Sequence, residues 1–326
     1  MRQIAVSIFL LFVVVSFFSC KKNKNGPQKK ICHGSFVGVK PVSLDYGQLS
    51  GIDEKGMPKT YSEFPPIRSF YDYKIIPGQY RYICYGYNKK DSCVYYLAGN
   101  DTTEDIYLYK YNMATKQTEM FTCTNPKAID YMPDLWYLYY NSFTNEFYIG
   151  FYYIGTTWYV NRKIKLTITG HTFSAAGFSV QGLSSPQVIA PSFIDEQTGD
   201  MYFHEGSFYF RYSPITGETT PQSYTGAIYG SEFNPNDGKV YGFNSTKQLV
   251  RLDPKTGVYQ AYGFLDANTD SITGTTFDVC NNQYIFCKTW NNVLNIYWVD
   301  VASGKIAKQV ATQGDYFSLI HIPQTQ

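Results

Sequence analysis

The chain has 326 residues, 44% of them hydrophobic and 17% charged, so it is long enough to bury a large core. Residues 1–30 contain six of the 28 basic residues and no acidic residue, which leaves 22 basic and 26 acidic residues, a net charge of −4, for the remainder. That balance argues against a domain built to bind nucleic acid or another polyanion.

The first 20 residues are typical of a bacterial export signal. Arg2 supplies the basic start, and residues 4–18 form an apolar run of about 15 residues, shorter than the roughly 20 that a spanning helix needs. The run ends in Ser19 and Cys20, an ending that resembles the lipobox of bacterial lipoproteins. We therefore expect residues 1–20 to be a lipoprotein signal peptide with Cys20 as the acylated residue. The alternatives are an uncleaved anchor and a plain secretory signal.

Residues 21–34 are expected to be a flexible basic tether. The stretch KKNKNGPQKK contains five lysines and no acidic residue, and it would hold a folded domain clear of the bilayer. In bacterial lipoproteins an Asp directly after the acylated Cys often marks retention at the inner membrane, and Lys21 stands there instead. By this resemblance, we expect a cell-envelope protein anchored in the outer membrane through its lipid and facing the periplasm.

A repeated hairpin pattern fills most of the remaining chain. Its second strand reads GKVYGF, GDMYFH, NEFYIG, SCVYYL and NQYIFC, starting at Gly238, Gly199, Asn145, Ser92 and Asn282. Tyr241, Tyr202, Tyr148 and Tyr95 fall in register, with Ile285 in the fifth copy. The third strand and its turn read LVRLDPKTG, YFRYSPITG, IYWVDVASG and LYKYNMATK, whereas residues 163–170 match less well. Short strands separated by turn residues predict four-stranded antiparallel meanders.

The spacing of these meanders predicts an all-β β-propeller over residues 35–326. First strands begin near Gln79, Trp136, Val188, Ala227 and Ser271, at intervals that suit four-stranded blades. Residues 316–322 look like a further first strand, but the chain stops at Gln326. Its partners would have to come from the N-terminal region, where FVGVKPVSL is strand-like. This predicts six blades closed by strands from both chain ends, with seven blades as the alternative.

The cysteines permit disulfides in an exported protein. Cys84 with Cys93, and Cys280 with Cys287, flank turns at hairpin-like separations, and buried thiols are the alternative. The chain has neither a C-x-x-C motif nor a close pair of histidines, so a zinc site is not expected.

The sequence contains none of the common catalytic motifs. G-x-S-x-G, H-E-x-x-H, GxxxxGK[ST] and GxGxxG before a helix are all absent, and the four histidines are scattered. Propellers place ligands at one mouth of the ring, so the loops entering the first strands and joining the second to the third are the candidate site. The residues that we select from those loops are Trp136, Trp158, His204, Glu205 and Trp290.

The blade turns and the N-terminal segment together resemble β-propeller lipoproteins of the Bacteroidota cell envelope. The resemblance covers residues 35–323 and implies an architecture but no specific activity. We expect a non-enzymatic module that binds a glycan, a peptide or an envelope protein through the channel rim, without nucleic acid and without a cofactor. One alternative resembles calcium-dependent lactonase-like hydrolases, with Glu232 and Asp278 as candidate ligands. The other is a propeller lyase or cyclotransferase, with His204 or Glu205 as the base.

Overall fold

A computed structural model describes residues 34–41, 46–59, 67–68, 85–100, 105–129, 135–154, 159–184, 191–205, 208–223, 226, 228–264, 272–290, 293–312 and 317–323. The chain divides into two units, Met1–Ile31 and Cys32–Gln326, and every described residue belongs to the second. The predicted signal peptide with Cys20 lies outside the described residues, as does almost all of the predicted tether. Within the described ranges, no helix has the length and hydropathy needed to cross a bilayer.

The described strands form six antiparallel blades of four strands each, which we number 1 to 6, and blades 2 and 3 join at their outer strands into one eight-stranded sheet. Blade 1 contains β25 (Phe317–Pro323), β1 (Gly34–Pro41), β2 (Tyr46–Asp53) and β3 (Pro58–Lys59), with β4 (Ile67–Arg68) also paired to β2. Blade 2 contains β5 (Tyr85–Asn88), β6 (Cys93–Asn100), β7 (Asp105–Asn112) and β8 (Thr118–Cys123). A short 3-10 helix, η2 (Pro126–Ala128), leads to blade 3, which contains β9 (Leu135–Asn141), β10 (Glu146–Ile154), β11 (Tyr159–Thr169) and β12 (Thr172–Phe178).

The second half of the chain repeats the same unit. Blade 4 contains β13 (Phe193–Ile194), β14 (Met201–Glu205), β15 (Phe208–Tyr212) and β16 (Thr219–Ser223). Blade 5 contains β17 (Tyr229–Asn234), β18 (Lys239–Phe243), β19 (Gln248–Leu252) and β20 (Tyr259–Phe264). Blade 6 contains β21 (Ile272–Asp278), β22 (Gln283–Trp290), β23 (Val293–Asp300) and β24 (Lys305–Ala311). First strands start within two residues of the positions predicted in blades 3, 5 and 6. In blades 2 and 4 the predicted starts, Gln79 and Val188, lie outside the described residues, and the described strands run from Tyr85 and Phe193.

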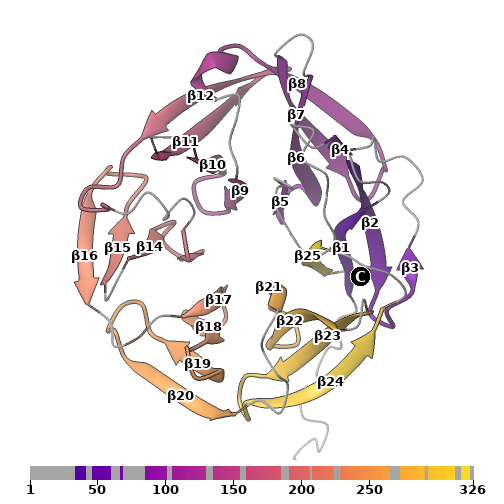
Figure 1. Cartoon of the computed structure of the whole chain (residues 1–326), viewed down its shortest axis with the longest axis vertical. Helices are drawn as coiled ribbons and strands as arrows, with labels where there is room; N and C mark the ends of the chain where they lie inside the picture. The colour runs from indigo at the N-terminus through magenta and orange to yellow at the C-terminus, as the bar shows by residue number, and fades with distance from the viewer. Residues whose placement is uncertain are drawn as a thin grey trace, which may run out of the picture. The chain divides into compact units, whose positions relative to one another are not determined.

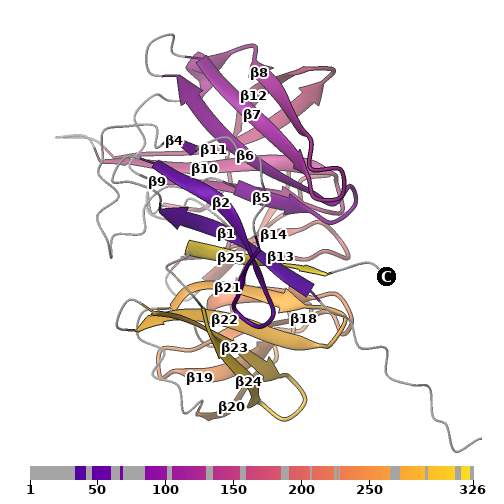
Figure 2. The same cartoon turned by 90° about the vertical axis from the view of Figure 1, so that its right-hand side faces the viewer.

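The blades surround a common centre, with β5, β9, β17, β21 and β25 nearest to it (Figure 1). β25 pairs with β1 from the other end of the chain, with Val37 opposite Ile320 and Ser35 opposite Ile322. On its other side β25 lies beside β21 of blade 6 (Figure 2). The prediction of a six-bladed propeller closed by both chain ends is therefore confirmed.

The hairpin between the first and second strands has the same construction in five blades. An Asn or Asp ends the first strand or, in blade 4, directly follows it, and its side-chain oxygen accepts the backbone N–H two residues later at 2.8–3.1 Å. These buried side chains belong to Asn88, Asn141, Asp195, Asn234 and Asp278. Four residues further on, the chain takes a positive φ between 55° and 79° at Ser92, Asn145, Gly199, Gly238 and Asn282. Gly and Asn tolerate this conformation best, which explains the residue types that repeat there.

The repeated tyrosines of the second strands are core residues. The hydroxyl groups of Tyr95 and Tyr241 donate to turn carboxylates four residues earlier, Asp91 at 2.8 Å and Asp237 at 2.6 Å. Tyr148 donates to Glu146 at 2.6 Å. Each ring is buried, so the phenol fills the space between blades while its hydroxyl reaches a polar partner at the turn.

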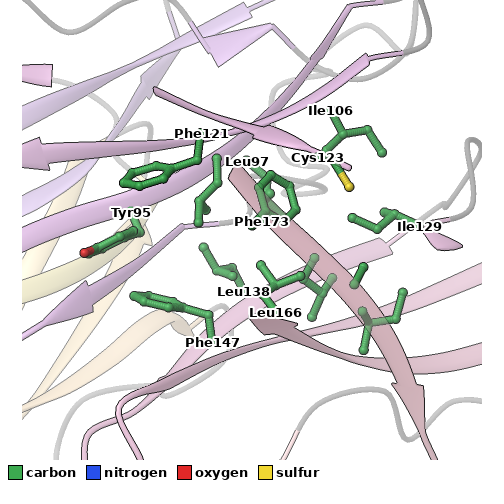
Figure 3. Close-up of a cluster of buried hydrophobic side chains, with 14 of the residues drawn as sticks. Tyr95, Leu97, Ile106, Phe121, Cys123, Ile129, Leu138, Phe147, Leu166 and Phe173 are labelled. Carbon is green, nitrogen blue, oxygen red and sulfur yellow. The ribbon is translucent and has the colours of Figure 1, made fainter. Parts of the chain in front are cut away.

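Each pair of neighbouring blades encloses one apolar cluster. The cluster between blades 2 and 3 is drawn in Figure 3, where Tyr95, Leu97 and Phe121 of blade 2 face Leu138, Phe147 and Leu166 of blade 3. Five further clusters fill the remaining junctions, and they include Tyr148 with Phe203, Tyr209 with Val250, Phe243 with Phe286, Phe36 with Trp298, and Val37 with Val94. Burial of apolar surface around the whole ring therefore holds the blades together.

Candidate functional site

The meander topology gives the propeller two different faces. The turns between first and second strands, and between third and fourth strands, lie on one face, which we call the turn face. The ends of the second strands, including Glu205 and Trp290, and the starts of the third strands, including Phe208 and Val293, lie on the other, which we call the loop face. Four of the five predicted rim residues, Trp136, His204, Glu205 and Trp290, belong to described strand ends on the loop face.

The structure describes these five residues to different extents. Trp158 lies outside the described residues. Trp136 in β9 and Trp290 in β22 are placed by their backbones, opposite Phe151 and Val293 respectively. Only His204 and Glu205, at the end of β14, have described side chains. A ligand-binding role of all five residues therefore stays a prediction.

His204 and Glu205 both have structural contacts. The His204 ring lies 4.8 Å from the Tyr209 ring, centroid to centroid. The Glu205 carboxylate accepts hydrogen bonds from the Ser184 backbone N–H at 2.9 Å and from the Ser184 hydroxyl at 2.6 Å. Since Ser184 follows blade 3, these bonds tie the segment between blades 3 and 4 to the end of β14.

A buried lysine lies close to Glu205, and the sequence reasoning missed it. Lys163 of β11 is 7% exposed, and its ammonium group lies 5.5 Å from the centroid of the Phe203 ring. Burial lowers the pKa of Lys163 to about 8, against an opposing effect of the Glu205 carboxylate. In the sequence, residues 163–170 stand out only as a poorer match to the third-strand pattern, and nothing there indicates a buried lysine.

Exposed apolar side chains begin three strands at the loop face of blades 4 to 6. Phe208 is 48% exposed, Tyr229 is 57% exposed and Val293 is 39% exposed. Phe208 and Val293 follow the loops between second and third strands, and Tyr229 begins the innermost strand of blade 5. Phe208 follows Glu205 by three residues, and Val293 follows Trp290 by three residues.

Glu232 of β17 is the most perturbed carboxyl group of the innermost strands that the structure describes. The Thr275 hydroxyl of the adjacent strand β21 donates to its Oε1 at 2.8 Å. Burial raises the pKa of Glu232 to about 7, although the hydrogen bond from Thr275 acts in the opposite direction. This carboxyl group therefore titrates near neutral pH.

The geometry does not bring Glu232 and Asp278 together as ligands of one calcium ion. Glu232 lies beside Thr275, and Asp278 is three residues further along β21, roughly 10 Å away at the rise of a strand. The carboxylate oxygens of Asp278 accept hydrogen bonds in the turn after β21, from the backbone of Cys280 and from Asn281. Among the described side chains, no group of three or more His, Cys, Asp or Glu residues could hold a metal ion.

The two predicted disulfide pairs do not form. Cys93 and Cys287 remain buried thiols, whereas Cys280 is disulfide-bonded. Cys280 lies in the turn before β22, and Cys287 lies four residues beyond the first residue of that strand, roughly 13 Å along it. That separation exceeds the reach of a disulfide. Cys84 lies outside the described residues, but its predicted partner Cys93 is a free thiol.

An open groove of about 740 Å³ lies between blades 2 and 3 on the turn face. Its lining includes the first turns of both blades, the strands β7, β8 and β11, and aromatic residues of the cluster shown in Figure 3. The charged lining residues are Lys90, Asp91, Lys110, Glu119, Glu146 and Lys165. The sequence prediction placed the site on the opposite face and missed this groove.

Comparison with known proteins supports the fold. No protein-family model matches the chain, and no curated protein sequence matches it. Among solved structures, TolB from Acinetobacter baumannii superposes with a TM-score of 0.57 and 10% identity, over 89% of this chain and 67% of that chain. AztD from Citrobacter koseri superposes with a TM-score of 0.50 and 8% identity, over 90% of this chain and 99% of that chain.

A third propeller structure is similar as well. The β-propeller domain of Cps50 (Swd1) from Myceliophteria thermophila superposes with a TM-score of 0.50 and 7% identity, over 85% of this chain and 83% of that chain. At such low identities these similarities establish the propeller fold alone, because one fold carries many unrelated activities.

Proposed function

We propose that the protein is a lipid-anchored envelope protein whose loop face binds a glycan, a peptide or an envelope protein without catalysing a reaction. The observation that carries this proposal is the group of exposed apolar side chains, Phe208, Tyr229 and Val293, on that face of blades 4 to 6. Exposed aromatic rings beside polar groups are the surfaces that proteins use to stack on sugars and to anchor peptides.

The polar partners in this proposal are His204 and Glu205, with Trp136, Trp158 and Trp290 as further aromatic members of the rim. Glu205 already accepts two hydrogen bonds from Ser184, which suits a residue that orients a ligand better than a residue that exchanges protons with one. A binding role therefore fits the described contacts better than a lyase with Glu205 as its base.

The experiment is a thermal-shift assay of the purified protein with oligomers of N-acetylglucosamine and with soluble peptidoglycan fragments. A ligand that binds the folded state raises stability by about 2.7 kcal/mol at a hundredfold excess over Kd. Phe208→Ala and Tyr229→Ala should remove most of the shift. Ile215→Ala and Val258→Ala are matched controls, because these residues are exposed on the turn face. A shift that survives both loop-face variants would contradict the proposal.

The membrane part of the proposal rests on Cys20 and the tether that follows it. We propose that the lipid on Cys20 holds the protein in the outer membrane, with the propeller in the periplasm. Mass spectrometry of the mature N-terminus should find a diacylglyceryl group on Cys20, and Cys20→Ser should release the protein from the membrane fraction. A soluble wild-type protein would contradict the anchor.

The second candidate function is a propeller lyase or cyclotransferase. The observation that favours it is the pKa of Glu232, which burial raises to about 7, close to the value that suits a general base or acid. The test first requires a substrate that the protein converts. The rate of that reaction should then fall by at least a hundredfold in the Glu232→Gln variant. An unchanged rate would remove Glu232 from the reaction.

A further inference from the structure

The groove between blades 2 and 3 is a separate site on the turn face. It opens between the β5–β6 turn of blade 2 and the β9–β10 turn of blade 3, and it runs outward to β8 and the end of β11. Its volume of about 740 Å³ falls within the range of small-ligand sites, roughly 300–1,000 Å³. Four of its lining residues, Tyr95, Phe121, Phe147 and Leu166, belong to the buried apolar cluster between the two blades.

The charges in the middle of the groove are paired within each blade. In blade 2, the Lys110 ammonium group lies 3.3 Å from Asp91, which also accepts a hydrogen bond from the Tyr95 hydroxyl. In blade 3, Lys165 pairs with Glu146. Burial alone would raise the pKa of Glu146, but the hydrogen bonds from Lys165 and Tyr148 outweigh it and lower that pKa. The middle of the groove is therefore internally neutralised.

The two ends of the groove carry opposite charges that are not neutralised in this way. Lys90, in the turn after the innermost strand β5, is exposed and forms no ion pair with any described residue. At the outer end, Glu119 of β8 lies 3.3 Å from His171, which is 84% exposed and uncharged unless protonated. Lys110 stands opposite Glu119 in the strand register, but its ammonium group pairs with Asp91. The groove is positive at its inner end and negative at its outer end.

The distance between these ends sets the size of the ligand. The distance from the turn that joins β5 and β6 to the outermost strand β8 is two to three strand spacings, about 10–14 Å. An extended peptide advances roughly 3.3–3.6 Å per residue, so three or four residues span that length.

We propose that this groove binds a short zwitterionic peptide of three or four residues, with its carboxylate at Lys90 and its amine at Glu119. The paired charges between them, Asp91 with Lys110 and Glu146 with Lys165, face the polar backbone of the peptide. This site is independent of the loop face, and it selects for free termini.

The test uses tetra-alanine in three forms: with both termini free, with an acetylated amine, and with an amidated carboxylate. Isothermal titration of the full-length protein should show saturable binding of the free peptide, weakened about five-fold by either cap. Lys90→Ala should weaken the free peptide about five-fold and leave the amidated peptide unchanged. Glu119→Gln should weaken the free peptide similarly and leave the acetylated peptide unchanged.

The controls separate this site from other surfaces. Lys305→Ala removes an exposed lysine from the turn face of blade 6 and should have no effect. Phe208→Ala and Tyr229→Ala should leave peptide binding intact, whatever they do to a loop-face ligand. Equal binding of the three peptides, equal effects of Lys90→Ala on the free and amidated forms, or no saturable binding at millimolar concentration would each overturn the proposal.

Discussion

Gly34 of β1 and His321 of β25 lie against each other in blade 1, where the two ends of the chain meet. A Cβ atom added to Gly34 would lie 2.0 Å from Nε2 of His321. The imidazole cannot easily move away, because its side chain is 2% exposed and its ring lies 5.2 Å from that of Phe36. Gly34 is therefore required by a close approach of two strands, rather than by a turn.

We predict that Gly34→Ala lowers the free energy of unfolding by about 2–4 kcal/mol, because the added methyl group overpacks this contact. Gly34→Ala combined with His321→Ala should be less unstable than the sum of the two single variants, since the second change frees the space. Urea unfolding measures all three proteins. Gly177→Ala, where the added Cβ atom meets nothing closer than 4.0 Å, is the matched control. Strict additivity would contradict this account.

Glu232 makes the stability of the propeller depend on pH. Its pKa in the folded protein, about 7, lies above its ordinary value of 4.5 because of burial. Below pH 4.5 the side chain is protonated in both the folded and unfolded states, so it costs nothing. As the pH rises from 4.5 to 7, the unfolded chain ionises first and stability falls. Above pH 7 the full cost is present.

Glu232→Gln should therefore gain stability relative to the wild type as the pH rises, by about 2 kcal/mol between pH 5 and pH 8. The amide oxygen of Gln can still accept the hydrogen bond from Thr275. Urea unfolding at both pH values measures the difference. A stability difference between the two proteins that does not change with pH would show that Glu232 titrates alike in the folded and unfolded states.

Blades 2 and 3 are joined at their outer strands, unlike the other neighbours among the described strands. β8 and β12 run parallel, with Thr122 opposite Thr172 and Cys123 opposite Phe173. The Asn125 side chain extends this ladder, because its amide group donates to the Ala175 carbonyl at 2.8 Å and accepts from the Ala175 N–H at 2.9 Å. The Asn125 side chain therefore adds two hydrogen bonds to the β8–β12 ladder and holds the outer strands of blades 2 and 3 together.

We predict that Asn125→Ala costs about 1–3 kcal/mol, because both backbone groups of Ala175 lose their partners. Amide hydrogen exchange should speed up at Ala175 and its neighbours in β12, while exchange in blade 5 stays unchanged. Asn295→Ala is a suitable control, since the Asn295 amide bonds locally to the Val293 carbonyl. If exchange at Ala175 is unaffected, the Asn125 bonds do not hold the two outer strands together.

The repeated elements could be predicted from local chemistry, and the sites could not. An Asn or Asp at the end of the first strand, with Gly, Asn or Ser four residues later, forms the same turn in blades 2 to 6. Asn234 and Gly238 therefore predict a hairpin from the local sequence alone. The contacts of Glu232 with Thr275 are different, since they depend on which strands become neighbours in the ring. The groove between blades 2 and 3 depends on the same packing, as does the burial of Lys163. No local pattern encodes these arrangements.

Closure of the ring joins residues that are far apart in the sequence. β1 and β25 pair across almost the entire chain, whereas each of the other described blades is a meander of consecutive strands. Contacts of such long sequence separation carry the largest loop-closure entropy, so they are expected to form late in folding. The apolar clusters on either side of blade 1, with Phe36 and Val37, then depend on that last step.

This order of events predicts different kinetics for two similar substitutions. Phe36 belongs to the junction of blades 6 and 1, and Phe243 belongs to the junction of blades 5 and 6. Both rings are buried, so Phe36→Leu and Phe243→Leu should each cost about 1–2 kcal/mol at equilibrium. Phe36→Leu should mainly speed unfolding, with a φ-value near zero, whereas Phe243→Leu should also slow folding. Stopped-flow folding and unfolding in urea measures both rates, and a higher φ-value at Phe36 than at Phe243 would mean that the ends of the chain meet before the neighbouring blades pack.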